Sequence, residues 1–157
     1  MEPVGVTARQ AIWSLSMHVK EFPTAQFKPN QAIPIDALRA NIRDQLGAVA
    51  QREDNWDDRE SKKPSTVALN NARRLMEELL DSVISTAQPW LTPFISSDED
   101  GHITVAWHKG EHEFHLIVTD KQILYISVWG INIETEMDMD VLSKHNYVPL
   151  WTWLLDG

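Results

Sequence analysis

The apolar residues of this chain recur at helical spacing as far as Pro89 and alternate one by one from Phe94 onward. A period of 3.6 residues marks one face of a helix, and a period of two marks one face of a strand. Because a single change of period divides the sequence, it predicts one α+β domain over residues 1–157, large enough to enclose its own core. We expect N-terminal helices packed on a C-terminal three- or four-stranded antiparallel sheet, with a short C-terminal helix.

The helical part, about residues 1–88, is predicted to contain three helices. The first spans about 8–20 and the second about 35–50, and Ser65 can cap the third. The first helix has the apolar stripe Ala11, Ile12, Leu15 and Val19. We expect the third helix to be the scaffold for the sheet, through the stripe Ala68, Ala72, Leu75, Met76, Leu79 and Val83.

The charged segment 51–63 contains almost nothing to bury apart from Trp56. This composition predicts a mobile loop. A lone Trp in such a loop usually docks back on its own domain, but Trp is also enriched at binding hot spots. Trp56 is therefore a candidate partner-binding residue, with docking on the domain as the alternative.

The sheet part, about residues 94–140, has the pattern of an antiparallel meander. Residues 96–101 form a predicted turn, and hairpins at 109–110 and 120–121 separate strands that begin near 103, 112 and 123. After Gly130, a predicted bulge or turn, the acidic strand follows. Pro149 can open a C-terminal helix within about 149–155, whose Trp151 and Trp153 are expected to close the core.

Acidic and apolar side chains alternate without a break over residues 134–140. In an extended strand one face would carry Glu134, Glu136, Asp138 and Asp140 as a row of carboxylates roughly 6–7 Å apart. The other face would place Ile131, Ile133, Met137, Met139 and Val141 toward a core. Such a row suits recognition by a basic partner; the alternative is that it protects an edge strand from pairing with another chain.

The net charge of −9 lies almost wholly in the C-terminal part. Residues 1–93 have 11 Lys and Arg against 12 Asp and Glu, whereas residues 94–157 have 3 against 11. This field disfavours direct binding to nucleic acid and favours a basic protein or a nucleic-acid-handling complex; plain solubility is the alternative. We expect no membrane association and a cytoplasmic location, because no apolar run is long enough to span a bilayer and no leader pattern is seen. The absence of Cys excludes disulfides and thiolate chemistry.

Two groups of residues resemble metal sites in part. His108, His112 and His115 flank one hairpin, but strand parity places His112 and His115 on opposite faces, so the three cannot converge. Asp98, Glu99 and Asp100 precede Gly101 as in part of a calcium loop, but the remaining ligand spacing is missing, and an ordinary turn is expected. We expect neither metal nor cofactor and assign no catalytic residue. Asp98, Glu99 and Asp100 join the candidate partner-binding residues.

Residues 93–107 combine a Pro-Phe-Ile start, an acidic turn ending in Asp100-Gly101 and a strand ending in Trp107. This segment resembles a pattern in small bacterial proteins of unassigned function, although Ala106 stands where that pattern tends to have an acid. The resemblance, which concerns residues 90–129, implies a gene neighbourhood of mobile or toxin-antitoxin type.

Two functional hypotheses remain, with a third beside them. The first is a non-enzymatic acidic protein-binding module, an inhibitor or an antitoxin- or immunity-like protein, that mimics nucleic acid and docks on a basic surface. The second is a metal-assisted hydrolase or nuclease that uses Asp, Glu and His of the sheet. The third is an accessory protein that forms a homodimer.

Overall fold

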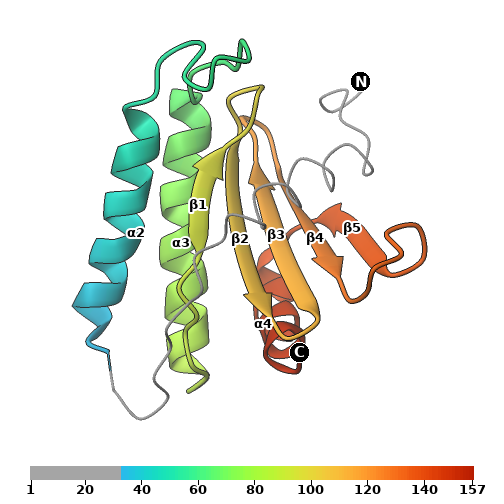
Figure 1. Ribbon diagram of the computed structural model, residues 1–157. Coiled ribbons are helices and arrows are strands. Elements are labelled where there is room, and N and C mark those ends of the chain that lie inside the picture. Colours follow the sequence, from blue (N-terminus) through green and yellow to red (C-terminus); the bar gives the residue numbers. More distant parts are fainter. Residues whose placement is uncertain (1–32) are drawn as a thin grey trace.

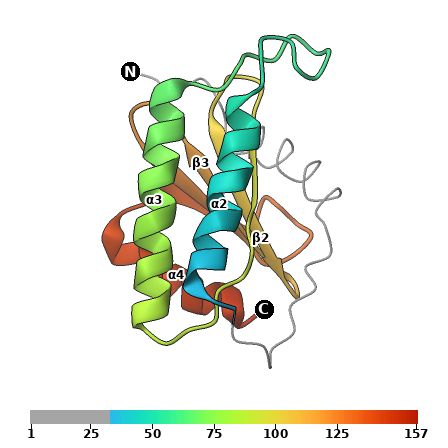
Figure 2. The ribbon, with the colours of Figure 1, turned by 90° about the vertical axis from the view of Figure 1, so that its left-hand side faces the viewer.

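The computed structural model describes residues 33–157, so the predicted helix at 8–20 lies outside the described residues. The elements are α2 (Ile35–Ala50), α3 (Thr66–Ser85), β1 (Phe94–Ser97), β2 (Ile103–Lys109), β3 (His112–Val118), β4 (Ile123–Val128), β5 (Met137–Val141), the 3-10 turn η1 (Lys144–Asn146) and α4 (Tyr147–Leu155). Helices α2 and α3 lie side by side on one face of the sheet (Figure 1). Turning the molecule shows both helices in front of the strands, with α4 below (Figure 2). The α+β class is confirmed.

The two long helices form where the apolar stripes predicted them. In α2 the stripe residues Leu38, Ile42, Leu46 and Val49 are all buried. The α3 helix begins as expected, because the Ser65 Oγ accepts a hydrogen bond of 3.2 Å from the Ala68 N–H. Such a cap satisfies one of the backbone donors that a helix start leaves without partners. The stripe of α3 then packs against α2 and the sheet.

The sheet contains five antiparallel strands in the order β1-β2-β3-β4-β5. The expected count of three or four was therefore too low, because residues 96–97 belong to β1 and not to a turn. Ser96 pairs with Thr104 and Ser97 pairs with Ile103. Both serines are buried, and the Arg52 guanidinium donates hydrogen bonds to their hydroxyl groups at 3.0 and 2.8 Å. Because Arg52, from a loop distant in sequence, satisfies both hydroxyl groups, two polar residues can be buried inside a strand.

The acidic strand is shorter than predicted. Strand β5 begins at Met137, and residues 133–135 form a hydrogen-bonded turn in which the Asn132 carbonyl accepts the N–H groups of Thr135 and Glu136. Ile131, expected in the core, is fully exposed at 101%. The turn prevents residues 133–135 from extending the strand, because their backbone bonds to Asn132 are incompatible with an extended ladder over the same residues.

The main core lies between the helices and the sheet and is centred on three tryptophans. The rings of Trp90 and Trp151 stack at 4.9 Å, and Trp107 meets both rings edge-on, at 6.0 and 5.3 Å. The Trp151 indole N–H donates to the Pro89 carbonyl at 3.0 Å, so the donor of this buried ring has a partner. Trp153 is half-buried and also packs against this core, as the sequence predicted for both residues.

A second, smaller apolar cluster lies on the opposite face of the sheet. Its buried members are Ile117, Ile126 and Val128, with Leu124, Ile133, Met137 and Met139 packed against them. The described helices pack on the other face (Figure 2). None of the described helices is long and apolar enough to cross a membrane.

Candidate functional site

The predicted acidic residues lie in two separate places on the domain. The first is the β5 edge, with Asp138 and Asp140 on the strand and Glu134 and Glu136 in the preceding turn. The second is the turn between β1 and β2, with Asp98, Glu99 and Asp100.

On β5 the alternation holds only from Met137 onward. Met137 and Met139 pack on the second cluster, while Asp138 and Asp140 are paired with residues of β4 whose side chains face the helices. The Tyr125 hydroxyl donates to the Asp138 Oδ2 at 3.4 Å. Burial raises the pKa of Tyr125, and the charges of the two aspartates add to the shift. The expected row of four carboxylates is thus replaced by two on the strand and two in a turn.

The β1–β2 turn is organised by the side chain of Asp98. Its Oδ1 accepts the N–H groups of Asp100 and His102, both at 2.9 Å. Gly101 has φ +82°, and a Cβ there would lie 2.6 Å from the Lys63 carbonyl oxygen. Glycine is therefore required both for the backbone conformation and for the close approach of the neighbouring loop.

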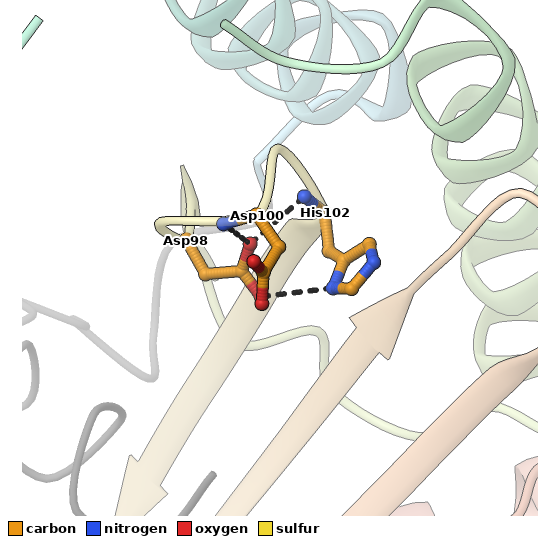
Figure 3. Close-up of side chains that lie close together, drawn as sticks. All are labelled: Asp98, Asp100 and His102. Atoms are coloured by element: carbon orange, nitrogen blue, oxygen red, sulfur yellow. Dashed lines mark hydrogen bonds and ion pairs between the residues drawn. The ribbon is translucent and has the colours of Figure 1, made fainter. Parts of the chain in front are cut away.

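His102 lies inside this turn and faces the two aspartates (Figure 3). Its Nδ1 is 3.1 Å from the Asp98 Oδ2, and both side chains are mostly shielded from solvent. The hydrogen bond with Asp98 raises the pKa of His102 above its usual value; the charges of Asp98, Asp100 and Asp120 also raise it, whereas burial opposes the shift. A protonated ring is favoured where three carboxylates surround it.

The same three side chains can offer ligand atoms to a metal ion. One atom each from Asp98, Asp100 and His102 lies within 4.8 Å of the other two, and in residues 33–157 this is the one such group. The sequence reasoning considered the aspartates and the hairpin histidines but overlooked His102. The spacing could have indicated this group, because an Asp, an Asp and a His at every second residue of a tight turn can bring three ligand atoms to the same side of that turn.

The loop from residue 51 to 65 is bonded to this turn. The Lys62 N–H donates to the Glu99 carbonyl and the Ser65 N–H donates to the Gly101 carbonyl, both at 2.9 Å. The Ser65 hydroxyl also donates to the Asp120 carboxylate, which lies in the β3–β4 turn. Three connections that are distant in sequence therefore meet at one end of the domain.

Trp56 docks back on the domain through Arg52. The Arg52 guanidinium carbon lies 3.8 Å from the centroid of the Trp56 ring, and the same guanidinium bonds Ser96 and Ser97. Burial lowers the pKa of Arg52, with the Asp57 charge acting against the shift. Trp56 remains half-buried, and its indole nitrogen has no hydrogen-bond partner.

We call this region the acidic end: residues 52–63, the turn 98–101 and the turn 120–121. It contains nine carboxylates, Glu53, Asp54, Asp57, Asp58, Glu60, Asp98, Glu99, Asp100 and Asp120, against five Lys and Arg. Some carboxylates hold the loop: Asp54 accepts the Lys63 N–H, and Asp57 accepts the Ser61 hydroxyl and the Arg59 N–H. Others, including Glu53, Glu99 and Asp100, are exposed on the surface. The predicted mobility of 51–63 stays a prediction.

The hairpin histidines separate as strand parity predicted. The ring of His112 stacks on Trp153 at 4.1 Å, and its Nδ1 lies 2.8 Å from the Trp153 carbonyl oxygen. His115 is buried on the opposite face; its Nε2 is 3.6 Å from Glu113, and its Nδ1 has no hydrogen-bond partner. The neighbouring His115 lowers the pKa of Glu113, against the effect of burial. His108 is exposed at the end of β2.

No protein-family model, curated protein or solved structure that was compared with this chain matches it. The resemblance of residues 90–129 to small bacterial proteins stays a prediction. Function must therefore be argued from the chain's own surface and side chains.

Proposed function

We propose that this protein is a non-enzymatic binding module that docks its acidic end on a basic protein surface, as an inhibitor or an antitoxin- or immunity-like protein. The observation that carries the proposal is the bonding of the 51–65 loop to the β1–β2 turn. It joins Trp56 and the Asp98–Asp100 turn, which the sequence separates by some forty residues, in one continuous region.

The electrostatics of the acidic end support a basic partner. Clustered carboxylates make the electrostatic potential at the acidic end more negative. This potential accelerates the encounter of the acidic end with a positively charged protein surface. The same field repels phosphates, so a nucleic-acid-handling partner would be recognised through its basic protein surface and not through its nucleic acid. We place this interaction in the cytoplasm.

The hydrogen bonds within the acidic end support a docking role in a second way. Binding by a loose loop costs the conformational freedom of every side chain that it orders. Here the Asn55 N–H donates to the Ser61 carbonyl at 2.7 Å and the Asn55 side chain accepts the Glu60 N–H at 2.8 Å. These bonds fix part of the loop before a partner arrives, which reduces that cost.

The experiment compares two triple charge reversals in the full chain. Glu53→Lys, Glu99→Lys and Asp100→Lys alter the acidic end, while Glu134→Lys, Asp138→Lys and Asp140→Lys alter the β5 edge. Both sets change the net charge equally, so a difference between them reports location and not total charge.

The measurement begins with affinity capture from the native host and continues with the dissociation constant of the captured basic protein at several salt concentrations. We expect the acidic-end variant to lose at least about tenfold in affinity at low salt and the β5 variant to lose much less. A larger loss of affinity in the β5 variant than in the acidic-end variant would place the interface at the β5 edge. Equal affinities for all three proteins, with both variants folded, would reject an acidic docking surface altogether.

A second candidate function, a metal-assisted hydrolase or nuclease, is favoured by the Asp98, Asp100 and His102 group. Carboxylate and imidazole ligands suit Mn²⁺ or Zn²⁺, which can activate water. Calorimetric titration of the full chain with each ion tests it, with Asp100→Asn as the control variant. Stoichiometric binding that Asp100→Asn removes, together with metal-dependent cleavage of a nucleic-acid substrate, would replace the docking proposal.

A further inference from the structure

Strand β5 ends the sheet, because in the described part of the chain it pairs only with β4. Two backbone bonds just beyond its ends fix the orientation of its peptide groups. The Trp129 N–H donates to the Glu136 carbonyl at 3.0 Å. At the other end, the Leu142 N–H donates to the Ile123 carbonyl at 2.8 Å. Because the two orientations alternate along an antiparallel strand, the even-numbered residues of β5 direct their backbone groups to β4 and the odd-numbered residues direct theirs outward.

The outward backbone groups belong to Met137, Met139 and Val141. The Val141 N–H is bonded to the Asp140 Oδ1 at 2.7 Å. Apart from the ladder with β4, no backbone bond within residues 33–157 involves Met137 or Met139. Strand β5 is also the strand farthest from β1 and the long helices (Figure 1). An edge of this kind can accept a further strand, with main-chain bonds that provide affinity and side chains that provide specificity.

The charges along β5 disfavour pairing with a second copy of this chain. If two β5 strands paired antiparallel about Met139, Asp138 of one copy would lie opposite Asp140 of the other. Like charges directly opposite each other on neighbouring strands are destabilising. Both carboxylates are exposed, and the Tyr125 hydroxyl bonds only the Oδ2 of Asp138. The same carboxylates would stabilise a strand that carries Lys or Arg at the facing positions.

We propose that the outer edge of β5 binds an extended basic segment of another protein as a further antiparallel strand. Side chains of an added strand alternate between the two faces of the sheet. On the face of Asp138 and Asp140 the segment carries Lys or Arg, and on the face of Met137 and Met139 it carries aliphatic residues. This surface lies outside the acidic end, so it would bind its segment whether or not the acidic end docks on a partner.

The probe is a synthetic peptide with blocked ends in which lysine alternates with valine, long enough to cover the five residues of β5. Its binding to the full chain is measured by fluorescence anisotropy. Two N-methylated forms test the backbone bonds, because in an antiparallel addition the valine N–H groups face β5 and the lysine N–H groups face away. We expect methylation of the valine nitrogens to weaken binding by at least about tenfold, and methylation of the lysine nitrogens by less than about threefold. Equal affinities of the two methylated peptides would overturn the proposal.

The charge requirement is tested with Asp138→Lys combined with Asp140→Lys. The control, Asp44→Lys with Glu111→Lys, makes the same change of net charge at two exposed positions outside β5. We expect the lysine peptide to bind at least about tenfold more weakly to the β5 variant and less than about threefold more weakly to the control. A peptide with glutamate in place of lysine should bind the β5 variant better than the original chain, which shows that the variant keeps its edge. Equal losses in the two variants would reveal attraction to net charge alone and would reject a site on β5.

Amide hydrogen exchange locates the bound peptide. In the free chain we expect rapid exchange at the Met139 amide, which faces outward, and slow exchange at the Asp140 amide, which faces β4. The bound peptide should slow exchange at Met139 by at least about tenfold and leave Asp140 unchanged. Protection of Met139 in the free chain would mean that another segment or a second copy already occupies the edge, and the proposal would be wrong. Rapid exchange at Met139 in the presence of saturating peptide would equally contradict it.

Discussion

The Lys62 backbone N–H lies 2.9 Å from the Glu99 carbonyl oxygen and donates a hydrogen bond to it. This bond, with the parallel one from Ser65 to Gly101, holds the charged loop against the acidic turn. Neither bond depends on a side chain. The position of the loop against the turn is therefore sensitive to backbone geometry.

Gly101→Ala will destabilise the domain by about 1–3 kcal/mol. The new Cβ would force a left-handed backbone on alanine and would approach the Lys63 carbonyl oxygen to 2.6 Å. Denaturant unfolding measures the loss, and hydrogen exchange at the Lys62 and Ser65 amides should accelerate. Gly47→Ala is the matched control: nothing lies within 4 Å of its Cβ position inside α2, so it should stabilise by about 0.5–1 kcal/mol. A loss of stability in both variants would contradict the geometric explanation.

Arg52→Met will lower the free energy of unfolding by about 1–3 kcal/mol. The change leaves the buried hydroxyl groups of Ser96 and Ser97 without their donor and removes the cation above Trp56. Arg59→Met, at an exposed position of the same loop, should change stability by less than about 0.5 kcal/mol. If the two variants unfold at the same denaturant concentration, the Arg52 contacts contribute nothing to stability.

Trp151→Ala will cost about 3–5 kcal/mol, because a fully buried ring is removed from the centre of the core. The loss includes its stacking on Trp90 and leaves the Pro89 carbonyl without this donor. Trp129→Ala is the control, since 37% of Trp129 is exposed, and its cost should be about 1 kcal/mol or less. Thermal unfolding followed by circular dichroism separates the two. Comparable midpoints would show that the tryptophan cluster is not the centre of stability.

The pair His102 and Asp98 makes stability depend on pH. The pKa of His102 is raised in the folded protein, whereas an unfolded histidine titrates near about 6.5. Its contribution is therefore complete below about pH 6.5 and is lost as the pH rises through the higher folded pKa. His102→Gln should lower stability most at the acidic end of this window and least at the alkaline end.

The control for the pH effect is Asp98→Asn, which keeps an oxygen that can accept the two backbone N–H groups but removes the charge. In that background, His102→Gln should have a much smaller pH-dependent effect, measured by urea unfolding from about pH 5.5 to 9. An unchanged pH dependence would assign the effect to Asp100 and Asp120, the other carboxylates that act on the ring.

The elements that the sequence predicted correctly are those whose apolar period runs over several turns or over a whole hairpin. Elements of this kind are helices α2 and α3 and strands β2, β3 and β4. Their buried face can be read from the repeat of apolar residues along the chain. Strand β1 was missed because Ser96 and Ser97 are polar. Their burial depends on Arg52, some 45 residues away in the chain, and no local pattern reports such a bond.

The candidate site was predicted only as separate parts. The acids of 98–100 and Trp56 were predicted separately as partner-binding residues, and that role stays a prediction; their proximity depends on two backbone bonds that composition does not encode. The row at 134–140 failed for a local reason. Asn132 accepts the Glu134 N–H with its side chain and two further N–H groups with its carbonyl, so a turn forms where alternation alone predicts a strand.

The order of the strands also determines when the domain can fold during synthesis. Every strand pairs with its neighbour in sequence, so each ladder closes only a short loop and forms quickly once its residues are available. The α3 stripe, however, leaves the ribosome before any of the strands that cover it. At roughly 5–20 residues per second, the synthesis of β3 is completed a few seconds after that of α3, so the apolar side of α3 has no sheet to pack against during that time.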